Sequence, residues 1–238
     1  MESIRRQART AGLLYLLMGI IAPIGLVIVP RSLLVAGDAA ATAEKVRASL
    51  WLLRLGIATD LVHQALAVFL VLQLYRLFKP VSELLAQQML ILGALVSVPI
   101  VFLNTVNQMA ALTLARGPAF LSVFDRGQSD ALAYLFLRLH SQGINVASIF
   151  WGLWLIPFGL LVVRSGWIPR VFGYLLLAAG TAYVVDAFVT ILLPTIAPYV
   201  DGPAMLLEVG ELPIVFWLAF KGVRAGHEGG APLLAASR

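Results

Sequence analysis

The chain has 238 residues, 61% of them hydrophobic and 12% charged, with a formal net charge of +5 and no cysteine. Soluble domains average roughly 45–50% apolar and about 25% charged residues, so this composition excludes a soluble globular protein and indicates a chain surrounded mostly by lipid. The absence of cysteine excludes disulfides and cysteine–metal sites, and the basic residues sit in short loops that orient a membrane protein, so we expect membrane lipid and no nucleic acid as partner.

Six apolar stretches follow one another along the chain, and a transmembrane helix needs about 20 mostly apolar residues. The predicted spans are Ala11–Val29, Leu52–Leu74, Leu84–Leu112, Leu135–Val163, Val171–Leu193 and Met205–Phe220. The third and fourth exceed one crossing, so we expect them to tilt or to protrude together as a helical hairpin. The pattern predicts an all-α, polytopic integral membrane bundle of six helices in one domain, residues 1–224, followed by a disordered tail, residues 225–238.

Three local features refine this prediction. Arginines before the first span imitate a secretory signal, but the apolar run reaches about Pro30, beyond the usual h-region of roughly 7–15 residues, so we interpret it as a retained span. The alanine-rich segment Asp38–Ser49 predicts a short helix on the membrane surface. Gly173 and Gly180, seven residues apart, either allow a neighbouring helix to pack closely or are ordinary membrane-helix glycines.

The distribution of lysine and arginine predicts that both termini are cytoplasmic. With the N-terminus inside, ten basic residues fall in inner segments: Arg5, Arg6, Arg9, Arg76, Lys79, Arg164, Arg170, Lys221, Arg224 and Arg238. Five fall in outer loops: Arg31, Lys45, Arg47, Arg116 and Arg126. Because basic residues concentrate in cytoplasmic loops, this ratio favours the inside orientation.

Five of the six predicted spans carry ionisable or amide side chains, and in this orientation most of them fall in the outer half of the bilayer. Such groups are costly in hydrocarbon and are functional-site candidates by default. The candidate ligand-binding residues are Asp60, His63, Asn104, Gln108, Arg138, His140, Asn145, Asp186, Glu208 and Glu211. Helical spacing places those within each span on shared faces, so the sequence predicts a polar, carboxylate-rich pocket in the outer half of the bundle.

Two other interpretations of these residues stay open. Asp60, Asp186 and the two glutamates would form a purely structural network if they only paired with Arg138 and the histidines across helices. Alternatively, His63 and His140 with a carboxylate such as Glu211 would supply the donors of a metal site, although no HExxH spacing is present and the ligands would come from different helices. The identity of any cofactor is not indicated.

Five short motifs in the second half of the chain carry a family resemblance. They are LRLHSQG at 137–143, FWGL at 150–153, RSGWIPR at 164–170, AGTAYVVD at 179–186 and GEL at 210–212. From about Thr10 to Arg224 the chain resembles the bacterial multi-pass membrane family catalogued as domain of unknown function 4386. The resemblance implies six or seven helices in the cytoplasmic membrane of a bacterium, singles out His140, Asp186 and Glu211 as motif positions, and implies no mechanism.

Three functions are compatible with the sequence. The favoured one is binding of a small molecule, lipid or ion in the outward-opening pocket. The alternative is an intramembrane enzyme, with or without a metal ion, that acts on a lipid-like substrate. A proton-coupled transporter is the least favoured, because the inner halves of the spans contain few polar residues, and because Asp60 and Asp186 both fall on the outer side, which does not fit inverted repeats.

Overall fold

The computed structural model describes residues 2–223, and every regular element in that range is helical. Six helices are long and apolar enough to cross a membrane: Ile4–Leu33, Leu50–Phe78, Glu83–Arg116, Arg126–Ser165, Arg170–Leu192 and Ala197–Lys221. The predicted all-α bundle of six spanning helices is therefore confirmed, whereas the predicted tail lies outside the described residues. An even number of spans places both described ends on one side of the membrane, and the cytoplasmic assignment of that side stays a prediction.

Three of the six spans are built from more than one helical segment. The first contains α1 (Glu2–Pro23), η1 (Ile24–Ile28) and α2 (Val29–Leu33). The third contains α5 (Glu83–Leu90), η2 (Ile91–Val96) and α6 (Ser97–Arg116), and the sixth contains α9 (Ala197–Glu208), η4 (Val209–Glu211), α10 (Leu212–Phe216) and η5 (Trp217–Lys221). The remaining elements are α3 (Ala39–Ala48), α4 (Leu50–Phe78), η3 (Ala119–Leu121), α7 (Arg126–Ser165) and α8 (Arg170–Leu192).

The segments η1, η2 and η5 are π-helical turns inside spans. The wider turn is visible in the backbone, where the amide of Val29 donates to the carbonyl of Ile24, five residues earlier. Pro30 and Pro99 follow the first two of these turns closely. Because proline has no N–H to donate, the regular hydrogen-bond ladder is broken there, and a π turn is a common accommodation of such a break.

The connection between α6 and α7 is capped at both ends. Helix α6 ends at Gly117, whose φ of +60° lies in the left-handed region that glycine adopts readily. Helix α7 begins after Asp125, whose carboxylate accepts a hydrogen bond of 2.8 Å from the Gln128 amide, while the Gln128 side chain accepts one of 3.1 Å from the Asp125 amide. This capping box extends α7 well before the predicted start at Leu135.

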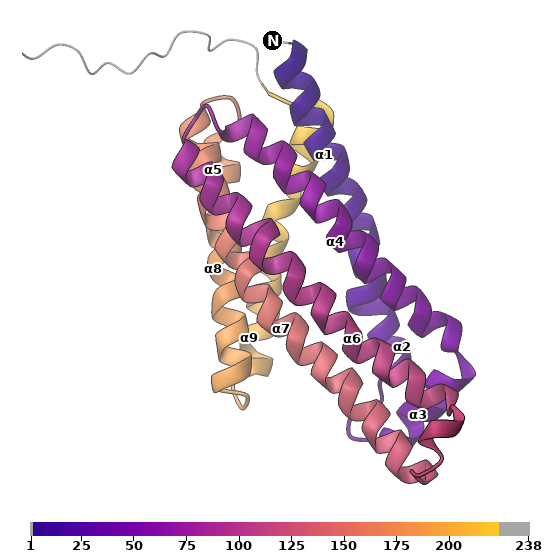
Figure 1. Cartoon of the computed structure of the whole chain (residues 1–238). Helices are drawn as coiled ribbons and strands as arrows, with labels where there is room; N and C mark the ends of the chain where they lie inside the picture. The colour runs from indigo at the N-terminus through magenta and orange to yellow at the C-terminus, as the bar shows by residue number, and fades with distance from the viewer. Residues whose placement is uncertain (1, 224–238) are drawn as a thin grey trace, which may run out of the picture.

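Helices α6 and α7 reach beyond α8 and α9, and α3 lies near their far ends (Figure 1). The 40 residues of α7 make a rod of about 60 Å, twice the hydrocarbon thickness of roughly 30 Å. The glycine contacts and the Asn145–Ala187 hydrogen bond between α7 and α8 lie from Val163 to Asn145 of α7. In Figure 1 the first turns of α7 extend past the end of α8. This arrangement matches the predicted helical hairpin formed by the third and fourth spans.

Two pairs of glycines bring α7 and α8 into backbone contact. A Cβ atom placed on Gly180 would lie 2.7 Å from the Gly152 carbonyl oxygen, and one on Gly173 would lie 2.7 Å from the Gly159 carbonyl oxygen. Both distances are too short for a side chain, so of the two interpretations left open for Gly173 and Gly180, the structure supports close packing. Small residues at membrane helix interfaces let backbones approach and gain van der Waals contact.

The short helix predicted between the first two spans is present as α3, and it is tied to the end of α7 that extends past α8. Its position on the membrane surface stays a prediction. The Arg47 guanidinium forms two hydrogen bonds with the Asp130 carboxylate, and the Gly37 amide donates to the Tyr134 hydroxyl at 2.9 Å. The Asp130 side chain is 9% exposed. The hydrogen bond to this carboxylate raises the pKa of Arg47, so the guanidinium stays charged.

Replacing Arg47 with methionine is expected to loosen α3 by about 1–2 kcal/mol, because the Asp130 carboxylate loses a bidentate partner while remaining mostly buried. Amide hydrogen exchange of residues 39–48 should accelerate by roughly 5–30-fold. Lys45→Met removes the same charge from an exposed position of the same helix and should change exchange little. Equal effects of the two replacements would show that the ion pair does not hold α3.

Candidate functional site

The ten predicted site residues do not form one pocket. Asp60, Asn104, Gln108 and His140 form a buried hydrogen-bonded network, and His63 and Glu211 line a cavity. The other four lie in neither place and are described below. The sequence predicted one carboxylate-rich pocket in the outer half of the bundle. The structure instead distributes the ten residues among a hydrogen-bonded network, a cavity and other positions.

The Asp60 network consists of Asp60 on α4, Asn104, Asn107 and Gln108 on α6, and His140 on α7. The Gln108 side-chain amide donates to Asp60 Oδ2 at 3.1 Å and to His140 Nε2 at 2.9 Å. Asn104 donates to the His140 carbonyl at 2.8 Å and accepts from Asn107 at 3.0 Å. Nδ1 of His140 lies 3.1 Å from the Asn104 side-chain nitrogen and 3.4 Å from the Asn104 carbonyl oxygen, so both ring nitrogens contact amide groups of α6.

Glycines on neighbouring helices make room for this network. A Cβ atom on Gly25 of η1 would lie 2.2 Å from Asp60 Oδ1, and one on Gly143 of α7 would lie 2.1 Å from Asn104 Oδ1. Asp60 and Gln108 are 4% and 2% exposed. These contacts join the first four spans, and polar contacts between helices stabilise a membrane fold. Among the described residues, Gln108 Oε1 is a buried atom without a hydrogen-bond partner.

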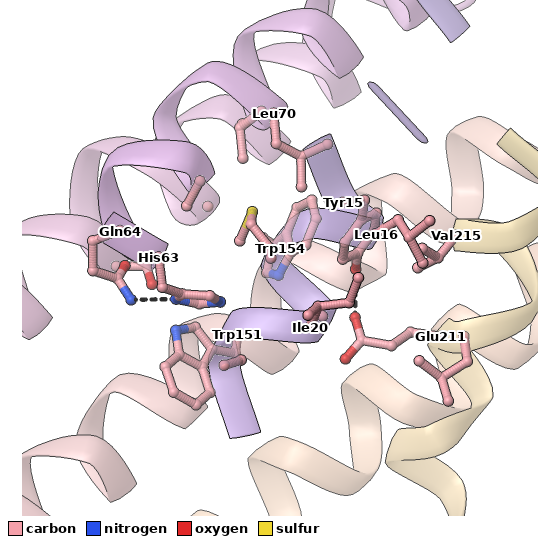
Figure 2. Close-up of a pocket in the computed structure, with 18 of the residues that line it drawn as sticks. Tyr15, Leu16, Ile20, His63, Gln64, Leu70, Trp151, Trp154, Glu211 and Val215 are labelled. Carbon is pink, nitrogen blue, oxygen red and sulfur yellow. Dashed lines mark hydrogen bonds between the residues drawn. The ribbon is translucent and has the colours of Figure 1, made fainter. Parts of the chain in front are cut away.

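A cavity of about 320 Å³ lies between the helices, and none of the residues of the Asp60 network lines it. Its wall is mainly aliphatic and aromatic, and its polar groups stand on opposite sides (Figure 2). The lining residues are Tyr15, Leu16, Met18, Gly19, Ile20, Ala22, Leu26, His63, Gln64, Ala67, Leu70, Val71, Gly93, Ser97, Trp151, Trp154, Tyr183, Glu211, Leu212, Val215 and Phe216.

One polar side of the cavity is formed by Glu211 and two tyrosines. The hydroxyl of Tyr15 donates to Glu211 Oε2, and the hydroxyl of Tyr183 donates to Glu211 Oε1 at 3.1 Å. The three residues come from α1, α8 and η4, so the carboxylate joins the first span to the fifth and sixth. Glu211 is placed there by the short 3-10 turn Val209–Glu211, which follows α9 and precedes Pro213.

The other polar side is formed by His63 and Gln64 on α4. The Gln64 side-chain amide lies 2.9 Å from His63 Nδ1, so it donates to the neutral ring. Adjacent residues on a helix point in different directions, yet both side chains reach the cavity, with the Trp151 indole beside them in Figure 2. The cavity therefore has a histidine–amide pair on one side and a carboxylate on the other.

The remaining predicted residues lie away from the cavity wall. Arg138 is exposed, and Asn145 donates to the Ala187 carbonyl at 3.3 Å, a link between α7 and α8. Asp186 and Glu208 lie near Asp201, in a group of carboxylates where α8 meets α9. The predicted pairing of these carboxylates with Arg138 is absent from the ion pairs formed by residues 4–223.

The three candidate metal ligands are not brought together. His140 contacts Asn104 and Gln108, His63 contacts Gln64, and Glu211 contacts two tyrosines. Within residues 2–223, no group of three or more histidine, aspartate or glutamate side chains is arranged to hold a metal ion. The hypothesis of a site shared by His63, His140 and Glu211 finds no support in this geometry.

Sequence reasoning missed the residues that give the cavity its character. Nothing in the sequence singles out Tyr15, Trp151 or Trp154, because aromatic residues are ordinary in membrane spans and at their ends. The ring of Trp154 lies 3.2 Å from the position of a Cβ on Gly93, at the π turn η2. Glycines inside spans were the available signal, since π turns and close glycine contacts often mark functional regions.

Comparisons with other proteins identify the family of this chain and supply no activity. A stretch of 79 residues, 33% of this chain, is 32% identical to an uncharacterized protein of Archaeoglobus fulgidus, of which it covers 46%, about half the length. No solved structure matches the chain. The family model described as "Domain of unknown function (DUF4386)" matches residues 10–222. Because that match covers nearly all of the six spanning helices, the chain belongs to the family of multi-pass membrane proteins with the domain of unknown function DUF4386.

Proposed function

We propose that the protein binds a small, largely apolar molecule in this cavity, to whose wall all six spans contribute residues. The observation that carries this proposal is the cavity itself, with about 320 Å³ of space, a mainly apolar wall and a few polar groups. Ligand pockets typically have volumes of roughly 300–1,000 Å³ and a wall of this composition, in which sparse polar groups orient the ligand.

The wall of the cavity reaches the lipid-facing surface between α1 and α10. Its lining residues Ile20 and Phe216 are 62% and 48% exposed, and Gly19 beside them is also exposed. A ligand dissolved in the bilayer therefore has a direct route into the cavity. The Asp60 network is not part of the lining, so in this proposal it holds the outer part of the bundle together and does not contact the ligand.

Replacing Gly19 with phenylalanine is expected to block binding, because Gly19 lines the cavity and a Cβ atom added there has no neighbour within 4 Å. The measurement is quenching of tryptophan fluorescence in the detergent-solubilised protein by the neutral probe 1-bromo-4-tert-butylbenzene. We expect saturable quenching in the wild type. Gly19→Phe should lower the apparent affinity for the probe at least tenfold.

The matched control is Gly202→Phe, since a Cβ atom at Gly202 also meets nothing within 4 Å and this residue is outside the cavity wall. Trp151→Phe should remove part of the quenching, whereas Trp51→Phe should not, because Trp51 is 65% exposed and remote from the lining. Quenching that is not saturable, or that is the same in Gly19→Phe and Gly202→Phe, would exclude binding in this cavity.

A further inference from the structure

The cavity has an acidic group and aromatic rings but no lysine or arginine in its wall. Glu211 is the one carboxylate among the lining residues, and the aromatic ones include Tyr15, Trp151, Trp154 and Tyr183. The sole lining residue able to acquire positive charge is His63, which stands on the other side of the cavity in Figure 2. The electrostatic character of the Glu211 side is therefore set by a carboxylate and by ring faces.

Glu211 has no cationic partner in the described part of the chain. The ion pairs there join Arg47 to Asp130 and Lys79 to Glu83, and the one other close contact of this kind is between the His140 ring and Asp60, at 3.5 Å. Its two carboxylate oxygens accept hydrogen bonds from the tyrosine hydroxyls, and each oxygen retains a second lone pair. A carboxylate surrounded by apolar groups is costly to keep charged unless a cation pairs with it.

The aromatic rings beside Glu211 are not occupied by a cation of the protein. Tyr15 contacts the carboxylate through its hydroxyl, and its ring centroid lies 6.1 Å from that of Trp154, with the two planes inclined by 48°. The Trp154 indole is stacked on Phe158 on one face, with centroids 5.5 Å apart. Among residues 4–223, the one cation–π contact places Lys79 over Tyr75, outside the cavity. Ring faces attract cations, and aromatic cages are a common means of binding quaternary ammonium groups.

We propose that the cavity prefers a lipophilic organic cation, such as a quaternary ammonium compound with an apolar substituent. The cationic group would lie against Glu211 and the rings of Tyr15 and Tyr183. The apolar part would lie among aliphatic residues such as Leu70, Val71 and Val215. A bare metal ion does not fit this wall, because it needs several oxygen or nitrogen ligands. The inference rests on the proposed function, since it names the ligand class of the same cavity.

The test uses two probes of nearly the same shape. One has a positively charged quaternary nitrogen where the other has a neutral quaternary carbon. They are (4-bromophenyl)trimethylammonium and 1-bromo-4-tert-butylbenzene, and both quench tryptophan fluorescence through bromine. Affinities are measured for the wild type and Glu211→Gln, with free probe concentrations corrected for partitioning into protein-free micelles. We expect Glu211→Gln to weaken binding of the cation at least tenfold and binding of the neutral probe less than twofold.

Each outcome distinguishes the inference from the proposed function. If the neutral probe binds and the cation binds no better or is unaffected by Glu211→Gln, the cation preference is wrong and the cavity remains a binding site. If neither probe binds saturably, both proposals fail. If Glu211→Gln does not fold, competition experiments on the wild type decide the question. Phenyltrimethylammonium should displace the brominated cation at free concentrations at least tenfold lower than those that tert-butylbenzene requires. Equal potency of the two competitors would overturn the inference.

Discussion

Replacing Gly12 with alanine is expected to lower the free energy of unfolding by about 3 kcal/mol. Gly12 of α1 packs directly on the backbone of η5, where an added Cβ atom would lie 2.1 Å from the Ala219 nitrogen and 2.4 Å from the Leu218 carbonyl carbon. Both atoms belong to helical backbone and cannot turn aside as a flexible side chain does. The last span would have to move away from the first, which would also disturb the cavity wall at Val215.

The matched control is Gly19→Ala, two helical turns further along the same helix. A Cβ atom at Gly19 has nothing within 4 Å, so alanine there should stabilise the protein by about 0.5–1 kcal/mol through its better helix propensity. Reversible unfolding in mixed micelles measures both changes. Similar effects of the two replacements would show that α1 and η5 are not in backbone contact.

Replacing Gln108 with methionine is expected to destabilise the bundle by about 2–3 kcal/mol. The amide of Gln108 donates to both Asp60 and His140, so without it Asp60 Oδ2 loses a hydrogen bond of 3.1 Å and faces the His140 ring at 3.5 Å. Methionine preserves the length of the side chain, so the loss comes from the missing hydrogen bonds. The measurement is again the free energy of unfolding in mixed micelles, with Gln142→Met on the exposed face of α7 as the control.

The double variant Asp60→Leu with Gln108→Met separates a hydrogen-bonding effect from a packing effect. Leaving one buried polar group without its partner is costly, whereas replacing both by apolar groups of similar shape is often nearly neutral. We therefore expect the double variant to recover to within about 1 kcal/mol of the wild type. If the two losses simply add, Asp60 and Gln108 do not act as a pair.

Local hydropathy was sufficient to find all six spans, but it misplaced several of their ends. The first and sixth spans are longer than predicted, and α7 begins at Arg126, nine residues before Leu135. Apolar content stops at the edge of the lipid, whereas a helix continues as long as its backbone is satisfied and its end is capped. The Asp125–Gln128 capping box was visible in the sequence and explains the extension.

Helical spacing predicted which polar residues share a face, and it predicted poorly which faces meet. Asn104 and Gln108 do join His140 and Asp60 across three helices. Glu211, by contrast, meets Tyr15, 196 residues earlier in the chain, and not the histidines. The rotation and tilt of each helix about its own axis decide such pairings, and neither is encoded in the spacing of residues along one span.

The sequence by itself determined the class of protein and the helices, because lipid requires every spanning segment to be apolar and to satisfy its own backbone hydrogen bonds. Only the tertiary structure decided where the polar groups go: one set closes on itself as the Asp60 network, while Glu211 and His63 face each other across an apolar cavity. The physical reason is the close approach of helices at glycines such as Gly12, Gly25 and Gly180, which sets how the spans are rotated and what space remains between them.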